Sequence, residues 1–326
     1  GRKIVKQKTE DHCVSDQKQI LILQETGGNK LLEQKTASFK VIKKIKDEKF
    51  NIDHLEHYTL LLQIGTRDLQ VCVVDSRDSQ CLVLEDYVLA KVNSPEQWKE
   101  FIYQSFESHP FLMAGFWKQV KISFKNQKFS HIPNPLFVPD RLHDYLKINC
   151  KVSPEKENFY YFKAIKSDAI TVFAVYSVVA DWLKDLYPNC DVGFVHQSAG
   201  LIEGVLDYSS SHKQNSVYLY IDRFKVHILT VKNNNLEYYN QFVVKEFQDY
   251  IKYLMMVMKG LNYKQENTHV VLWGYVGKKS PHFNEFHKYI KDISFGDRPT
   301  YLKFGYLFDE VQDHQYMDLY SIYLCE

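Results

Sequence analysis

The chain has 326 residues, of which 45% are apolar and 25% are charged, the composition of an ordinary soluble globular protein. Its 41 Lys and Arg residues nearly balance 40 Asp and Glu residues, so the net charge of +1 provides no overall field for capturing nucleic acid or an acidic membrane. With only 13 Gly and 9 Pro, collagenous, linker-rich and broadly disordered chains are excluded. The length allows two domains or one large fold with internal duplication.

The six cysteines include no C-x-x-C pair, so the usual signal for structural zinc or thioredoxin-type chemistry is missing. Their density is low for a disulfide-stapled secreted domain, and six reduced thiols are predicted. The sequence contains no run of about 18 apolar residues, so no membrane span is predicted. Residues 1–6 lack the apolar core of a signal peptide. The sequence therefore predicts a cytoplasmic protein.

Residues 1–50 differ from the rest in charge. They hold 12 Lys and Arg residues against 7 Asp and Glu residues, a balance of +5. This pattern predicts a basic N-terminal extension that precedes the main fold and packs on it loosely. The alternating run Gln19–Gln24, followed by the turn residues Thr26–Asn29, predicts a small hairpin within it. A basic arm for nucleic acid is the alternative, but the interspersed acids favour a solvated extension.

Regular structure is predicted from residue 58 onward. Three apolar runs separated by turn residues indicate a β-meander, and Ser94-Pro95-Glu96 has the N-cap, first-position proline and first-turn acid that open a helix. The predicted strands are 58–64, 69–74, 81–84, 120–124, 169–176 and 192–196, and the predicted helices begin at 95 and cover 141–146, 177–186 and 197–206.

The same order of elements returns about 155 residues later, and such a repeat indicates duplication of a whole domain. The predicted elements there are strands at 217–221, 224–231, 236–244 and 270–273 and helices at 245–261 and 281–293. The predicted fold class is α/β, with two βββαβα halves at residues 51–212 and 213–326 and helices on both faces of mixed sheets.

Two such halves resemble the actin-like ATPase superfold (ribonuclease-H-like), which includes actin, hexokinase, heat-shock chaperones and bacterial assembly proteins of the PilM and FtsA type. More narrowly, LQIG at 62–65, HIP at 131–133 and the closing DL…LCE at 318–326 are similar to domain-of-unknown-function family 3822, found chiefly in Bacteroidetes. The resemblance covers about residues 50–326. It implies an actin-like ATPase fold and no established activity.

The superfold implies a nucleotide site at two hairpin turns, where an aspartate holds Mg²⁺ and backbone amides meet phosphate. In the first hairpin Gly65 and Thr66 remain, but Gln63 stands where the acid is expected. In the second hairpin Asp222 remains, but a bulky Arg-Phe pair follows where glycine is expected. Both changes weaken the case for bound phosphate and metal.

The superfold also implies adenosine-binding glycines after a strand. Gly274 and Gly277 follow a predicted strand and match this feature in part, although such glycines more often simply form a turn. No catalytic residue and no metal ligand is predicted. The candidate cofactor-binding residues, those of a vestigial nucleotide site, are Gly65, Thr66, Asp222, Gly274 and Gly277. Asp75 is the other acid near a meander turn, and Arg67 and Arg223 are the side chains that could still pair with an anion.

Two further patterns are weaker. His54 and His57 lie three residues apart beside two acids, but with no third metal ligand identifiable, exposed turn residues are favoured. Ser198 follows His196 closely enough to suggest a nucleophile with its base, yet the G-x-S-x-G elbow is missing and a serine at a helix start is usually a cap.

The altered turns favour a non-catalytic protein-interaction scaffold without a cofactor. The predicted partner is another protein, with no nucleic acid and no membrane, and the oligomeric state stays open. The alternative is an ATPase or small-molecule kinase of the same superfold, which uses ATP with Mg²⁺ through atypical phosphate loops.

Overall fold

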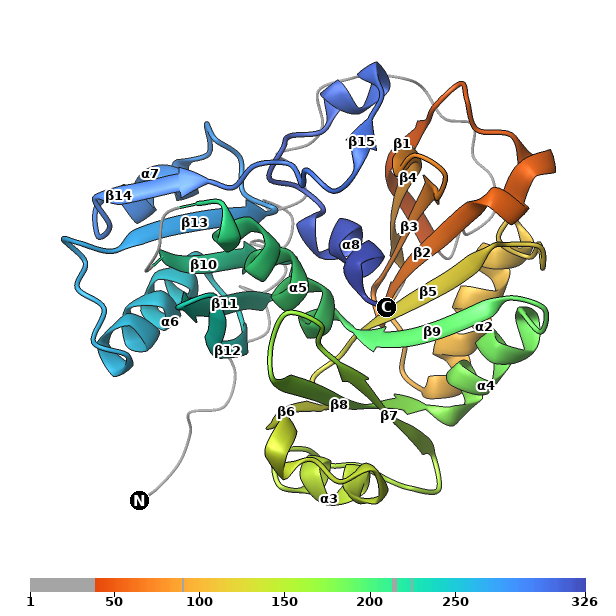
Figure 1. The fold of residues 1–326 in the computed structure, drawn as a ribbon, viewed down its shortest axis with the longest axis horizontal. Coiled ribbons are helices and arrows are strands. Elements are labelled where there is room, and N and C mark those ends of the chain that lie inside the picture. The colour runs from red at the N-terminus through yellow and green to blue at the C-terminus, as the bar shows by residue number, and fades with distance from the viewer. Residues whose placement is uncertain (1–38, 90, 213–215, 224) are drawn as a thin grey trace, which may run out of the picture.

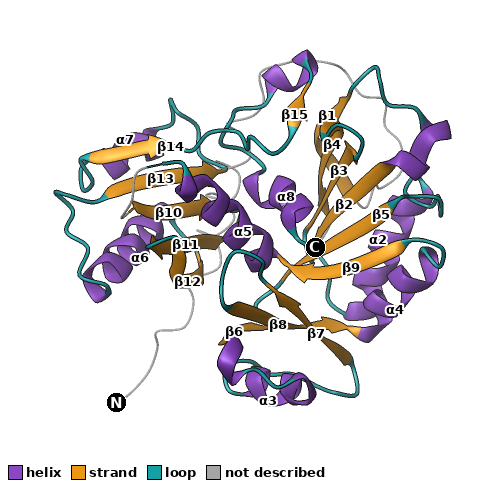
Figure 2. Cartoon of the chain, in the orientation of Figure 1, coloured by secondary structure: helices purple, strands orange, loops and turns teal. Residues whose placement is uncertain are grey.

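The computed structural model describes residues 39–89, 91–212, 216–223 and 225–326. Their strands form two large sheets and one small sheet, and helices pack on both faces of each large sheet (Figures 1 and 2). The hairpin predicted around Gln19–Gln24 lies outside the described residues.

The first large sheet contains the predicted meander and has the strand order β1-β4-β3-β2-β5-β9. The meander strands pair antiparallel, and β5 and β9 extend the sheet parallel to β2. The bounds are β2 (Tyr58–Gly65), β3 (Asp68–Asp75), β4 (Gln80–Leu89), β5 (Gln119–Lys125) and β9 (Asp191–His196), and the short β15 (Lys303–Phe304) also pairs with β4. The meander strands are buried on both faces, which explains their nearly continuous apolar runs.

The edge of this sheet is β1 (Phe39–Lys46), which pairs antiparallel with β4. Ile45 and Phe50 are buried in the core, so the first half starts before the predicted boundary at residue 51. The lysines of this strand lie mostly on its outer side, as is usual on an exposed sheet edge, and they give it the composition of a solvated extension.

Helices cover the first sheet on both faces. On one face lie α2 (Pro95–Glu107) and α4 (Ser177–Leu186), which bury Ile102 and Leu183 against the strands. On the other lie α8 (Met317–Ser321) and η5 (Ile322–Leu324), which bury Leu319 and Ile322. The N-terminus of α2 is as predicted, because the Ser94 hydroxyl accepts a hydrogen bond from the Gln97 amide at 3.1 Å.

An insertion separates β5 from α4. It forms a small antiparallel sheet in the order β6-β8-β7, with a helix packed on it (Figure 1). Its elements are β6 (Phe129–Pro133), η2 (Asn134–Leu136), η3 (Pro139–Arg141), α3 (Leu142–Lys147), β7 (Glu157–Lys163) and β8 (Ala169–Tyr176). The short helix predicted at 141–146 belongs to this insertion, and α4 takes the place of the second helix of the repeat.

The second large sheet has the order β12-β11-β10-β13-β14. One face is covered by α6 and α7 and the other by α5. The bounds are β10 (Ser216–Ile221), β11 (Lys225–Lys232), β12 (Asn235–Val243), β13 (His269–Gly274), β14 (Asp292–Phe295), α5 (Gln197–Ser210), α6 (Phe247–Gly260) and α7 (Pro281–His287). The predicted helix over 281–293 is wrong beyond His287, because Ile293 lies in β14 opposite Val270 and Phe295 opposite Leu272.

The strand orders β4-β3-β2-β5-β9 and β12-β11-β10-β13-β14 are the same, with three antiparallel strands followed by two parallel ones. This agreement supports the predicted duplication. The halves also exchange helices: α5 follows the first sheet but packs on the second, and α8 follows the second but packs on the first. Among the described residues, none of the helices combines the length and apolar character needed to cross a bilayer.

Candidate functional site

The β2–β3 turn of the first half and the β10–β11 turn of the second meet where the halves join. Lys125, the last residue of β5, lies between them. Its Nζ is 2.6 Å from Asp68 Oδ2, at the end of the first turn, and 3.0 Å from Asp222 Oδ1, at the start of the second. One ammonium group therefore joins a carboxylate of each half.

Arg223 of the second turn also binds acidic residues of the first half. Its guanidinium donates to Asp68 Oδ2 at 3.2 Å and to Asp86 of β4, and it lies over the Tyr275 ring at 4.5 Å. The hydroxyls of Tyr275 and Tyr316 each donate to Asp86 Oδ2 at 3.0 Å. We call Asp68, Asp86, Lys125, Asp222 and Arg223 the inter-hairpin network.

Asp222 and Lys125 of the network are buried, yet their interaction partners stabilise the charged form of each side chain. Burial opposes ionisation of Asp222, but the Lys125 charge, the nearby His227 imidazole and a hydrogen bond from Gln197 hold its pKa well below the ordinary range. Burial likewise opposes the charge on Lys125, and the carboxylates of Asp222 and Asp68 outweigh it and raise the lysine pKa. The geometry and the pKa directions agree on true ion pairs rather than neutral hydrogen bonds.

A hydrogen-bond cluster around Asp318 adjoins the network. The Gln63 amide donates to Gln70 Oε1 at 2.8 Å and to Asp318 Oδ2 at 2.5 Å, and Gln197 Nε2 donates to Asp318 Oδ2 at 2.9 Å and to Asp222 Oδ2 at 3.0 Å. Burial raises the pKa of Asp318, and the Lys125 charge together with the hydrogen bonds from Tyr220 and Gln197 partly offsets this effect. Gln63, where the sequence lacks the expected acid, thus links β2 to α8 as a hydrogen-bond donor.

Three of the five candidate residues come together at this junction. Gly65 pairs with Lys125 across the parallel strands, and a Cβ on Gly65 would lie 2.1 Å from Asp68 Oδ1. Gly274 pairs with Ile221, which precedes Asp222, and its φ of 96° belongs to the left-handed region that favours glycine. At both glycines a side chain would collide with the chain itself, with Asp68 at Gly65 and with the Ile221 backbone at Gly274.

Among the described residues, the other two candidates make no side-chain hydrogen bond or ion pair with the inter-hairpin network. Thr66 is exposed and, with Arg67, Lys91 and Trp98, lines a surface hollow of about 320 Å³. Gly277 lies in the loop that follows β13, and a Cβ added to it would be nearest to Ser280, at 3.8 Å.

The remaining predicted candidates lie elsewhere. Asp75 is at the opposite end of β3, where its carboxylate pairs with Arg77 at 2.6 Å. His196 Nδ1 lies 2.8 Å from Ser198 Oγ, and both side chains are fully buried. The imidazole accepts the Ser198 amide hydrogen and so caps α5, which makes the histidine, not the serine, the cap.

Sequence reasoning missed three members of the network, Asp68, Asp86 and Lys125, and also missed Gln197 and Asp318 of the adjoining cluster. The available signal was polar side chains inside otherwise apolar strands, as in LLQIG, LVLEDY and VKISFK. A buried strand carries such residues only when another element supplies their partners.

The chain belongs to a family described as "Protein of unknown function (DUF3822)", whose sequence profile matches residues 47–293. The resemblance noted in the sequence is thereby confirmed. No curated protein matches the chain in sequence.

Solved structures define the fold. A Bacteroides thetaiotaomicron protein "with actin-like ATPase fold and unknown function" is similar at a TM-score of 0.71 and 20% identity, covering 85% of this chain and 99% of that one. The "PilM-PilN type IV pilus biogenesis complex" is similar at a TM-score of 0.50 and 10% identity, covering 82% of this chain and 97% of that one. The protein therefore has an actin-like ATPase fold.

Proposed function

We propose that this protein is a non-catalytic scaffold that binds another protein. The observation that carries the proposal is the Lys125 ammonium, within 3.0 Å of a carboxylate from each hairpin turn. Phosphoryl transfer depends on a positioned metal that neutralises developing charge. Here Gln63 stands where the first acid is expected, a side-chain cation lies between the carboxylates of the two turns, and Arg223 binds Asp68 as well.

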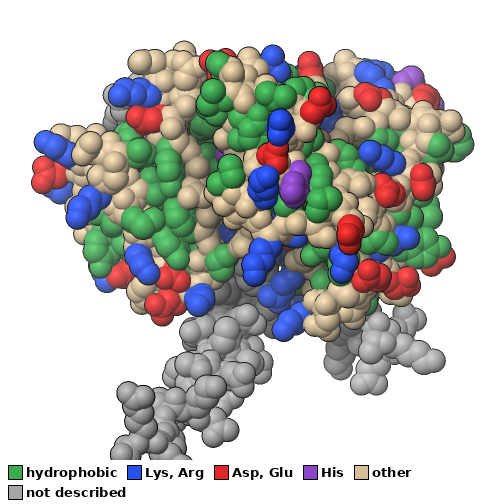
Figure 3. All heavy atoms as spheres, turned by 90° about the horizontal axis from the view of Figure 1, so that it is seen from below, with side chains coloured by type: hydrophobic (Ala, Val, Ile, Leu, Met, Phe, Trp, Pro, Cys, Tyr) green, Lys and Arg blue, Asp and Glu red, His purple; other side chains and the backbone are tan. Residues whose placement is uncertain are grey.

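A protein partner is supported by the PilM-PilN complex, a protein assembly similar to this chain in fold. The face seen in Figure 3 carries acidic and basic side chains interspersed with hydrophobic ones, which suits a protein better than the uniform negative charge of nucleic acid or an acidic membrane. The proposed compartment is the cytoplasm, in keeping with the free thiols of the five described cysteines.

Calorimetric titration of the full chain with Mg-ATP tests the absence of a nucleotide site. We expect no saturable binding tighter than about 1 mM, equivalent to about 4 kcal/mol. A parallel melting experiment with excess Mg-ATP should leave Tm unchanged, since a bound ligand would raise it by mass action.

Micromolar binding would contradict the proposal and favour the ATPase or kinase alternative, provided that Asp222→Ala abolishes it. The matched control is Asp75→Ala, which removes an acid at the opposite end of the hairpin. Circular dichroism of both variants separates loss of a site from loss of the fold.

A further inference from the structure

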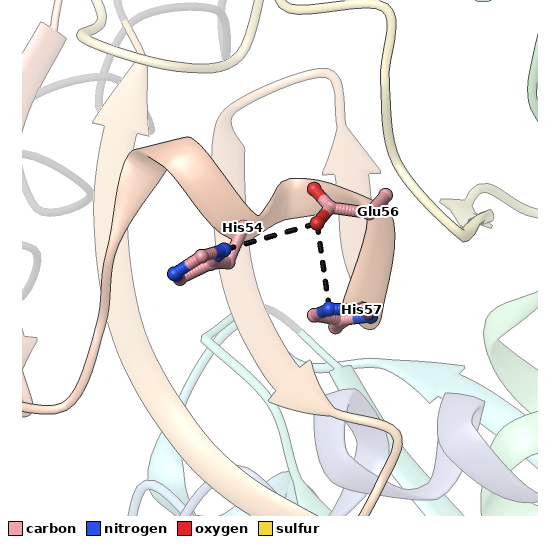
Figure 4. A group of neighbouring side chains, drawn as sticks. All are labelled: His54, Glu56 and His57. Atoms are coloured by element: carbon pink, nitrogen blue, oxygen red, sulfur yellow. Dashed lines mark ion pairs between the residues drawn. The ribbon is translucent and has the colours of Figure 1, made fainter.

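A group of metal-ligand side chains lies far from the inter-hairpin network, at the start of β2. His54, Glu56 and His57 are carried by η1 (Ile52–His57), and their ligand atoms all lie within 4.8 Å of one another (Figure 4). Glu56 Oε1 is 3.4 Å from His57 Nε2 and 3.8 Å from His54 Nδ1. The two imidazole rings are stacked at 6.0 Å. Glu56 is the third ligand that spacing alone did not identify.

Local structure holds this turn in place. The Asn51 side chain accepts the Asp53 amide hydrogen at 3.0 Å and caps the segment, and the His57 carbonyl accepts from the Ser76 amide at 3.0 Å. Leu55 is buried beneath, at 3% exposure. With the backbone tied at both ends and Leu55 buried, the three ligand side chains remain on the solvent side, where His54 and Glu56 are more than half exposed and His57 is 41% exposed.

The geometry points to a site for a borderline divalent cation, and we propose that His54, Glu56 and His57 bind Zn²⁺. Zinc takes imidazole nitrogen at about 2.0–2.1 Å and carboxylate oxygen at about 2.0–2.2 Å, so tetrahedral ligand atoms lie roughly 3.3–3.5 Å apart. The two contacts of Glu56 are already near this spacing. Exposed imidazoles close the remaining gap by side-chain rotation, and water completes the coordination.

Titration of the full chain with ZnCl₂ in a non-chelating buffer at pH 7.5 tests the site. We expect one saturable site per chain, and its loss in the double variant His54→Gln/His57→Gln. Glu56→Gln should weaken binding by at least the roughly 10- to 100-fold that loss of an outer-sphere partner causes. The control is His287→Gln, another exposed histidine, which should leave the affinity unchanged.

A second arm uses thermal melting. The melting temperature of the metal-free variants should match that of the metal-free wild type, while added Zn²⁺ should raise the melting temperature of the wild type alone. Absence of saturable binding, or wild-type affinity retained in the double variant, would overturn the proposal.

Discussion

The two hairpin turns occupy equivalent positions in the duplicated sheets but have diverged into complementary parts. In the first half the last residue of β2 is Gly65, and its neighbour on the parallel strand is Lys125. In the second half the last residue of β10 is Ile221, and its neighbour is Gly274. One half therefore places a long cation where the other has a glycine, and the second turn supplies the acid that this cation binds.

The difference shows how an internal repeat can lose its symmetry through electrostatics. A single buried charge at either turn would be strongly destabilising. Asp68 of the first turn accepts hydrogen bonds from Lys125 of its own half and from Arg223 of the second half. The buried charges of each turn therefore depend on partners from the other turn. The following predictions test this mutual dependence, from the largest expected effect to the smallest.

Lys125→Met is expected to have the largest effect. It leaves Asp68 and Asp222 buried without their shared cation, and breaking a buried ion pair by removing one partner destabilises by about 3–5 kcal/mol. Urea denaturation measures the loss as a lower midpoint.

The matched control is Lys121→Met on the same strand and the same face. Lys121 is also buried, but it donates to the Tyr323 carbonyl at 2.9 Å, and burial lowers its pKa. Removing it leaves no carboxylate uncompensated, so its cost should be clearly smaller. Equal losses for the two variants would show that the carboxylates do not depend on Lys125.

Acid is expected to weaken the contact between the insertion and the second half, where His131 packs against Tyr239 with ring centroids 4.9 Å apart. Burial lowers the pKa of His131 to about 4, against about 6.5 in the unfolded chain. Below pH 6.5 the unfolded chain therefore binds a proton that the folded chain does not. The free energy of unfolding decreases as the pH is lowered from about 6.5 to about 4. At pH 5 this amounts to about 2 kcal/mol.

Denaturation at pH 7 and pH 5 measures the effect, and His131→Phe should lose about 2 kcal/mol less between those values. Burial also holds the pKa of His196 well below its ordinary range, so a pH-dependent loss should persist in the variant. Asp222 contributes at lower pH, because its lowered pKa keeps its ion pairs until the pH falls below the ordinary aspartate range. An unchanged pH dependence in the variant would argue against a neutral imidazole at His131.

Gly65→Ala should have a smaller effect. The added Cβ would meet Asp68 Oδ1 at 2.1 Å, so the carboxylate must move away from Lys125. Overpacking of this kind typically costs about 1–3 kcal/mol. The control is Gly193→Ala on β9, where an added Cβ meets nothing within 4 Å. Similar stability of the two variants would show that the first turn tolerates displacement of Asp68.

The sequence predicted the fold better than the site, for a physical reason. Apolar periodicity and turn residues act within about ten positions, so the two meanders, their helices and the duplication were recognisable. The helix predicted over 281–293 is wrong at β14, because four residues are too few to show alternation. The extension predicted over residues 1–50 includes β1, because the lysines of this strand conceal its apolar face.

The site depends on contacts between distant segments. Lys125 meets Asp68 from 57 residues away and Asp222 from 97, and Gln63 meets Asp318 from 255. The missing acid at residue 63 was visible locally, as was Asp222. The partners of these residues, Lys125 and Asp318, were not visible, because the residue pattern of one strand does not reveal which side chain of a distant segment lies next to it.

The smallest effect is expected at the other end of the first hairpin, where Asp75 pairs with Arg77 at 2.6 Å. This ion pair is shorter than the Lys125–Asp222 and Arg223–Asp68 pairs, yet the Arg77 side chain is 58% exposed and water replaces the contact readily. The hydrogen bond from Arg77 lowers the Asp75 pKa, so NMR titration should show that pKa rising in Arg77→Ala while the urea midpoint barely changes. A midpoint shift as large as that of Lys125→Met would show that burial does not distinguish the two ends of the hairpin.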